Sequence, residues 1–68
     1  MPNATARVAR RVVALRQERG MSQEALAKKT GLNRVTLARL ERALHPPNLD
    51  TLDRIARALR VKLVDLVR

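Results

Sequence analysis

Residues 23–40, QEALAKKTGLNRVTLARL, contain two short helical patterns on either side of a single glycine. Each pattern has one inward face, formed by Leu26, Ala27 and Thr30 in the first and by Leu32, Leu37 and Leu40 in the second. Gly31 between them suits the left-handed backbone conformation that closes a helix. Two helices joined by so tight a turn approach within about 8 to 10 Å, so the small Ala27 fits where they cross. The spacing predicts a helix-turn-helix over about residues 22–43.

The outward face of the second helix is strongly basic. It is formed by Asn33, Arg34, Val35, Ala38, Arg39 and Arg42. Three of these side chains are arginines and none is a carboxylate, which suits the major groove of duplex DNA.

The charge of the whole chain agrees with a polyanionic partner. Fifteen Lys and Arg residues against six Asp and Glu residues give a formal net charge of +9. The chain has no Phe, Tyr or Trp, the side chains on which the bases of single strands usually stack. Duplex DNA is therefore the favoured partner. Membrane binding is not expected, because the basic residues are spread over every segment instead of one face of one helix.

Length and residue usage narrow the class of protein. The 68 residues are enough for one small domain, here all-α with five helical segments and no strand pattern. Without cysteine there is no disulfide or thiolate metal site, and one histidine supplies neither a metal cluster nor a catalytic pair. We expect no enzyme, no catalytic residue, no metal and no cofactor. With no signal-like or transmembrane apolar run, we expect a cytoplasmic protein.

Polar residues predict where the helices begin and end. The first helix runs from about Thr5, as N-cap, to Arg19 and ends at Gly20, and the first six residues form a candidate mobile arm. Ser22 and Asn33 cap the second and third helices, and the third fades near residues 43–44 before two prolines. The fourth is capped by Asn48 or Asp50, and a last short helix covers residues 63–67. The predicted inward residues outside the helix-turn-helix are Val8, Val12, Leu15, Leu49, Leu52, Ile55, Ala56 and Leu59.

Three pieces of the chain follow one another in a characteristic order: VVALRQERG, MSQEALAKKTGLNRVTLARLER and PPNLDTLDRIARALRVKLVDL. Over nearly its whole length the chain resembles the Cro and phage-repressor type of helix-turn-helix domain, the xenobiotic-response-element family. The resemblance implies a lambda-repressor-like five-helix bundle whose third helix is the recognition helix. It also implies a homodimer on a two-fold DNA operator.

The same resemblance implies which residues meet DNA. It places base contacts at Arg34, Val35 and Arg39, with Asn33 and Thr36 within reach of a base or a phosphate. Arginine can donate two hydrogen bonds to guanine, and valine can pack on a thymine methyl group. It also implies phosphate contact by Gln23 at the start of the second helix. Weaker phosphate candidates are Arg10, Arg11, Lys28 and Arg42.

Further residues have predicted structural roles, one pair implied by the resemblance and others at positions that depart from it. Arg16 is implied to pair with Glu41, joining the first helix to the third. Ala43 and Arg60 stand where the family has a helix-ending glycine, so we expect those caps to take another geometry. Val64 and Val67 add apolar surface to the last segment, and Leu63, Val64, Leu66 and Val67 form the predicted dimer interface.

Three functions fit these features. A sequence-specific transcriptional regulator, expected to be a repressor, accounts for the motif, the charge and the missing aromatic residues together. The alternatives are the antitoxin of a toxin-antitoxin pair and a bridging factor that mainly contacts proteins. An antitoxin is expected to need extra surface or a tail for its toxin, and a bridging factor does not need the arginine-rich third helix.

Overall fold

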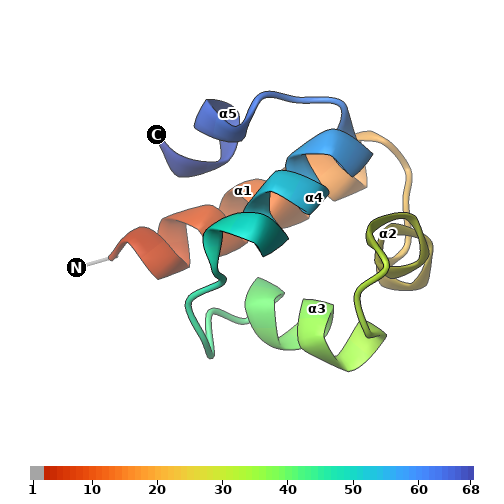
Figure 1. The fold of residues 1–68 in the computed structure, drawn as a ribbon, viewed down its shortest axis with the longest axis horizontal. Coiled ribbons are helices and arrows are strands. Elements are labelled where there is room, and N and C mark those ends of the chain that lie inside the picture. Colours follow the sequence, from red (N-terminus) through yellow and green to blue (C-terminus); the bar gives the residue numbers. More distant parts are fainter. Residues whose placement is uncertain (1–2) are drawn as a thin grey trace.

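The computed structural model describes residues 3–68, and within them the chain forms five helices and no strand. The helices are α1 (Ala4–Glu18), α2 (Gln23–Thr30), α3 (Arg34–Glu41), α4 (Leu49–Leu59) and α5 (Leu63–Val67). In Figure 1, α1 and α4 run across the middle of the bundle, α3 lies below them, and α5 lies above the N-terminal part of α1. The prediction of an all-α, five-helix bundle is confirmed. No helix among the described residues is long and apolar enough to cross a membrane.

Asparagine and serine side chains begin the first four helices. Asn3, Ser22, Asn33 and Asn48 each accept a hydrogen bond from a backbone N–H in the first turn, at 2.7 to 3.0 Å. The prediction of Thr5 as the first cap is wrong, because Asn3 takes that role and Thr5 lies inside the helix. Residues 1–2 of the predicted arm lie outside the described residues, and residues 3–6 belong to the start of α1.

One core joins all five helices. Its fully buried large side chains are Val12, Leu26, Leu37, Ile55, Leu59 and Leu66. Leu15, Met21 and Leu32 pack against this core from its edge. The prediction that Leu49 faces the core is wrong, because Leu49 is 66% exposed. Leu49 is the first residue of α4, and periodicity identifies the face of a helix but not the point where neighbouring helices stop covering it.

Ala43 and Arg60 both lie in the left-handed region, each with φ of 58°, although neither is glycine. The expectation of another cap geometry is therefore wrong. The next backbone N–H in each case bonds five residues back, from Leu44 to Arg39 at 3.1 Å and from Val61 to Ala56 at 3.0 Å. The left-handed residue makes this closing hydrogen bond possible, so both helices accept a strain of about 1 to 2 kcal/mol to end in this way.

A buried ion pair fixes α3 to the rest of the bundle. Nε and Nη2 of Arg16 donate to the two carboxylate oxygens of Glu41 at 2.7 and 3.0 Å. The remaining nitrogen of Arg16 donates to the carbonyl oxygen of Met21 at 2.7 Å, and Nε2 of Gln23 donates to Glu41 at 2.9 Å. The Arg16 and Glu41 side chains are only 13% and 5% exposed. This network, which we call the Arg16–Glu41 network, confirms the predicted pair and ties α1, the α1–α2 turn and the start of α2 to the end of α3.

Replacing Glu41 by glutamine should destabilise the protein strongly. The substitution removes the charge that compensates Arg16 where both side chains are largely buried, and stranding a buried charge costs about 3 to 5 kcal/mol. Urea unfolding of Glu41→Gln measures the loss. Glu18→Gln, at an exposed position on α1, is the control and should change the unfolding free energy by less than about 0.5 kcal/mol. Equal effects of the two substitutions would contradict a buried role for Glu41.

Replacing Ala43 by glycine should stabilise the protein by about 0.5 to 1 kcal/mol. Glycine adopts a positive φ without the steric cost that alanine has there, and this gain exceeds its larger loss of backbone entropy. Ala14→Gly is the matched control, because Ala14 is an exposed residue within α1. The control should lose about 1 kcal/mol. A loss of stability in both variants would show that Ala43 is not strained.

Candidate nucleic-acid interface

The α2–α3 turn is held by a small set of backbone and side-chain hydrogen bonds. Gly31 closes α2 with φ of 75°, and the Leu32 N–H donates to the carbonyl oxygen of Ala27 at 3.1 Å. A Cβ atom at Gly31 would meet no neighbour within 4 Å, so the backbone angle, and not space, requires glycine. The buried Thr30 hydroxyl lies 3.0 Å from both the Leu26 and Ala27 carbonyl oxygens and secures the last turn of α2. The turn therefore sets how α3 projects from α2.

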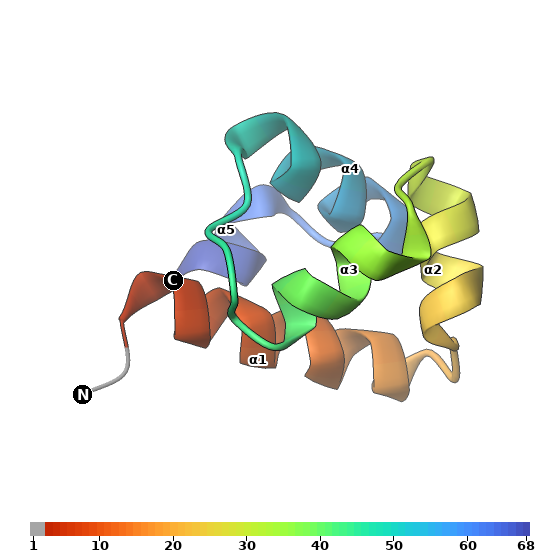
Figure 2. The same cartoon turned by 90° about the horizontal axis from the view of Figure 1, so that it is seen from below.

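α3 turns its apolar side inward and its basic side outward. Leu37 and Leu40 are buried, whereas Arg34, Thr36, Arg39 and Arg42 are exposed and Val35 is 50% exposed. At 100° per residue, Val35, Arg39 and Arg42 follow one another along the centre of the outer face, with Arg34 and Thr36 on opposite sides of it. Ala38 is only partly exposed. We call the exposed side chains of Arg34, Val35, Thr36, Arg39 and Arg42 the α3 basic face. Figure 2 shows α3 on the near side of the bundle.

Asn33 is less free than the sequence indicates. Its side-chain oxygen accepts a hydrogen bond from the Val35 N–H at 2.7 Å as the cap of α3. A two-point contact with adenine needs both the oxygen and the nitrogen of an amide. The capping bond fixes the orientation of the Asn33 oxygen and uses one of its two lone pairs, whereas the amide nitrogen has no hydrogen bond within residues 3–68 and can donate to a base or a phosphate.

Arg34 lies toward α2. It lines a hollow of about 420 Å³ together with Lys28, Ser22, Ala25 and Glu24. Lys28 and Arg34 therefore lie on the same side of α3 and can meet the same strand of a bound duplex. Glu24 is the only carboxylate that lines this hollow, and its place in the first turn of α2 suits the positive end of that helix.

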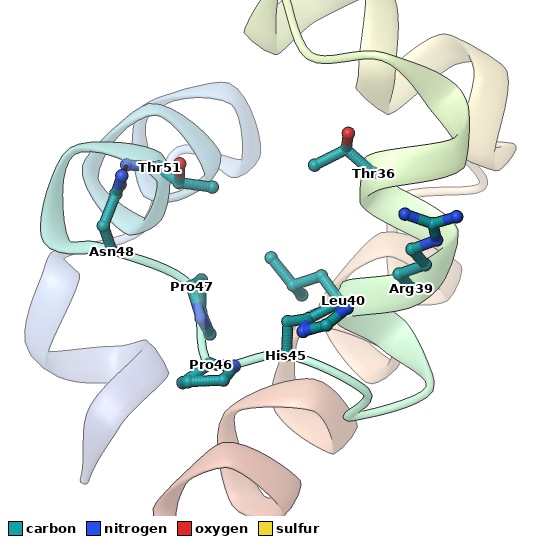
Figure 3. Close-up of a pocket in the computed structure, with 8 residues that line it drawn as sticks. All are labelled: Thr36, Arg39, Leu40, His45, Pro46, Pro47, Asn48 and Thr51. Atoms are coloured by element: carbon teal, nitrogen blue, oxygen red, sulfur yellow. Dashed lines mark hydrogen bonds between the residues drawn. The ribbon is translucent and has the colours of Figure 1, made fainter.

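On the other side of α3 the α3–α4 loop contributes residues that the sequence did not indicate. Thr36 and Arg39 border a hollow of about 240 Å³ whose opposite wall is formed by the loop and the start of α4. Figure 3 shows this wall, made of His45, Pro46, Pro47, Asn48 and Thr51. Asn48 caps α4 here, so the free N–H groups of its first turn lie beside the α3 basic face. The Pro-Pro-Asn sequence before α4 was the available signal, since it predicts a rigid loop that ends in a helix cap.

The predicted phosphate residues fall into two groups. Lys28 and Arg42 are exposed beside or on α3, and Gln23 lies at the start of α2 with its amide bonded to Glu41. The structure does not bring Arg10 and Arg11 to this face. They line a separate hollow of about 320 Å³ with Arg7 and Arg68, beside α5.

The predicted interface on α5 needs one correction. Val64 and Val67 are 49% and 37% exposed, and Leu63 is partly buried against the core. Leu66 is completely buried within its own chain. It supports α5 from below and offers no contact area to a second copy, so the assignment of Leu66 to a dimer interface is wrong.

A family model described as helix-turn-helix (HTH_3) matches residues 12–66, which include the turn, the α3 basic face and α5 up to Leu66. The chain belongs to the helix-turn-helix family of DNA-binding transcriptional regulators. This membership confirms the resemblance to Cro and phage-repressor domains that the sequence shows.

Relatives in this family include a phage protein and an archaeal protein. The immunity repressor protein of Bacillus phage phi105 is 40% identical over 60 residues, which are 88% of this chain and 42% of that repressor. The chain thus spans less than half the length of the phage protein. An uncharacterized HTH-type transcriptional regulator of Archaeoglobus fulgidus is 39% identical over 56 residues, covering 82% of this chain and 80% of the regulator.

Solved structures of the family have the same fold. The hypothetical transcription factor NHTF from Neisseria superposes with a TM-score of 0.93 at 30% identity, over 97% of this chain and 76% of NHTF. The restriction-modification controller protein C.AhdI from Aeromonas hydrophila superposes with a TM-score of 0.88 at 31% identity, over 91% of this chain and 94% of the controller protein.

Arg39→Ala and Lys28→Ala should weaken DNA binding in different ways. If Arg39 donates to a guanine, its loss costs about 1 to 3 kcal/mol on the preferred site and relaxes the preference at one base pair per half-site. Loss of Lys28, a predicted phosphate contact, should weaken binding to all DNA sequences alike. Both variants are titrated with the preferred duplex and a scrambled duplex at one fixed salt concentration. Equal weakening of both duplexes by Arg39→Ala would assign it an electrostatic role and leave Arg34 as the main base reader.

Proposed function

We propose that this chain is a sequence-specific repressor that binds an inverted-repeat operator in duplex DNA as a homodimer. The observation that carries the proposal is the α3 basic face, where Val35, Arg39 and Arg42 follow one another in solvent. The one carboxylate of α3, Glu41, is turned into the protein and neutralised there. A helix with this distribution of charge fits the major groove, and the likeness to a phage immunity repressor supports repression.

Base recognition is assigned to the centre and the N-terminal end of α3. Arg39 and Arg34 are long enough to donate to guanine, and Val35 between them packs on a thymine methyl group. Thr36 lies on the flank that faces the α3–α4 loop, where it meets either a base edge or a phosphate. The preferred half-site should therefore contain a G·C pair and a nearby thymine.

Phosphate binding is assigned to the two sides of α3. On one side lie Gln23, at the N-terminus of α2, and Lys28; on the other side lies the N-terminus of α4. Helix N-termini favour anions through their free N–H groups and the helix dipole. Two such ends on opposite sides of one recognition helix would hold the phosphate backbones that border the groove.

Dimer formation is assigned to α5. Val64 and Val67 are exposed, apolar and three residues apart on the same helix, so they lie on one face. A second copy related by a two-fold axis would cover this face with its own Val64 and Val67. Such a dimer presents two α3 helices to the same side of a duplex, which accounts for an operator made of two inverted half-sites.

Selection of bound sequences from a random pool of duplex DNA tests the proposal. The enriched sequences should contain an inverted repeat with half-sites about 10 base pairs apart, centre to centre. This spacing follows because the two α3 helices of such a dimer would enter the major groove one turn of DNA apart. Enrichment of a single unrepeated motif would remove the homodimer from the proposal. No enrichment at all would remove sequence-specific binding.

The double variant Val64→Asp, Val67→Asp tests whether α5 forms the dimer contact. It should sediment as a monomer and bind the selected repeat more weakly, because four carboxylates would meet at the two-fold axis. Leu49→Asp places a carboxylate on another exposed apolar residue, at 66% exposure and outside α5, and should remain a dimer. A dimer in the double variant would show that the contact lies elsewhere.

A further inference from the structure

A second basic surface lies on the side of the bundle formed by α2 and α4. Two adjoining hollows of about 430 and 330 Å³ share Lys29, Ala58 and Arg60. The cations around them are Arg19, Lys29, Arg54, Arg57 and Arg60. We call this surface the α2–α4 basic groove.

The positive charge of this groove is largely uncompensated. Neither hollow is lined by a carboxylate. Of the five cations, Arg57 alone makes an ion pair within residues 3–68, with Asp53 on the preceding turn of α4 at 3.1 Å, and both side chains are well exposed. So many cations around one depression create a local positive potential that concentrates anions.

The groove is separate from the α3 basic face. Its residues come from the α1–α2 turn, the C-terminal end of α2 and the middle and C-terminal end of α4, and none of them lines the hollows on either side of α3. Lys28, a predicted phosphate contact, precedes Lys29 in α2 but lines the hollow beside Arg34. In Figure 1, α3 lies at the bottom of the bundle and the C-terminal half of α4 at the upper right. We therefore expect a duplex held by α3 to leave the groove open.

The lining of the groove favours a protein segment over a nucleic acid. Its second hollow has an apolar part lined by the partly exposed Met21 and Ala58, which we call the apolar floor. A bound segment with both carboxylates and aliphatic side chains would pair with the arginine and lysine side chains and also cover the apolar floor.

We propose that the α2–α4 basic groove binds an acidic, aliphatic segment of a partner protein while α3 is occupied by DNA. Such a contact would link the DNA-bound domain to another protein without competition for the recognition helix. The charge and the apolar floor carry this inference, which is independent of the homodimer and of the operator sequence.

A labelled peptide that alternates glutamate and leucine tests the proposal. It is titrated into the full chain, both free and saturated with a short DNA duplex, and the backbone amide signals are followed by NMR. The amides of Lys29, Ala58, Leu59 and Arg60 should shift in both states. Shifts on α3 alone in the free chain, and none in the DNA-bound chain, would overturn the proposal. Failure to bind DNA would count against the proposed function only, because the titration of the free chain still reports on the groove.

Two variants of equal charge separate a specific surface from net charge. Lys29→Glu, Arg54→Glu should lower peptide affinity about tenfold or more, whereas Arg10→Glu, Arg11→Glu, beside α5, should lower it no more than about threefold. Equal losses would show attraction by net charge only and overturn the proposal. If a reversed-charge variant does not fold, the pair Lys29→Gln, Arg54→Gln and Arg10→Gln, Arg11→Gln makes the same comparison.

Two further probes define the chemistry of the partner. A peptide that alternates glutamate and serine should bind more weakly than the leucine peptide, because it leaves the apolar floor uncovered. Single-stranded oligothymidylate should shift the groove amides less than the leucine peptide does. A stronger response to the oligonucleotide would make the groove a nucleic-acid site and contradict the assignment to a protein.

Discussion

The orientation of α3, the proposed recognition helix, depends on one largely buried carboxylate. Glu41 accepts three hydrogen bonds, two from Arg16 on α1 and one from Gln23 at the start of α2. A charge at a position with so little exposure is tolerated only when it is fully hydrogen-bonded. No buried side-chain nitrogen or oxygen among the described residues lacks a hydrogen bond. The same contact removes the one negative charge of α3 from its outer face. Fold and candidate function thus depend on the same carboxylate.

Local patterns in the sequence were enough to predict most of the fold. Ser22, Asn33 and Asn48 mark the beginnings of three helices, and Gly31 marks the end of α2, because caps and left-handed turns depend on a few neighbouring residues. The outer face of α3 was predictable for the same reason, since helical spacing alone separates Val35 and Arg39 from Leu37 and Leu40. The Arg16–Glu41 pair, by contrast, joins residues 25 apart in the chain and came from the family resemblance.

Apart from the choice of Thr5 over Asn3 as the first cap, the errors share one physical origin, which is that local patterns do not show what lies beside a residue in space. Leu49 and Leu66 are both leucines at helical spacing, yet one is exposed at a helix end and the other is buried beneath α5. Ala43 and Arg60 adopt a positive φ because the closing hydrogen bonds that follow them outweigh their intrinsic preference. The hollow between α3 and the α3–α4 loop likewise depends on how two distant segments pack.

The Arg16–Glu41 network also bears on the entropy of recognition. Because Gln23 is already bonded to Glu41, the start of α2 and the end of α3 are held in a fixed relation before any ligand arrives. Such preorganisation limits the freedom lost on binding to a few exposed side chains, each costing about 0.5 to 1.5 kcal/mol. On the proposed function, the domain should therefore meet DNA nearly as a rigid body, with the backbone of α3 already ordered and only long arginine side chains left to adjust to the groove.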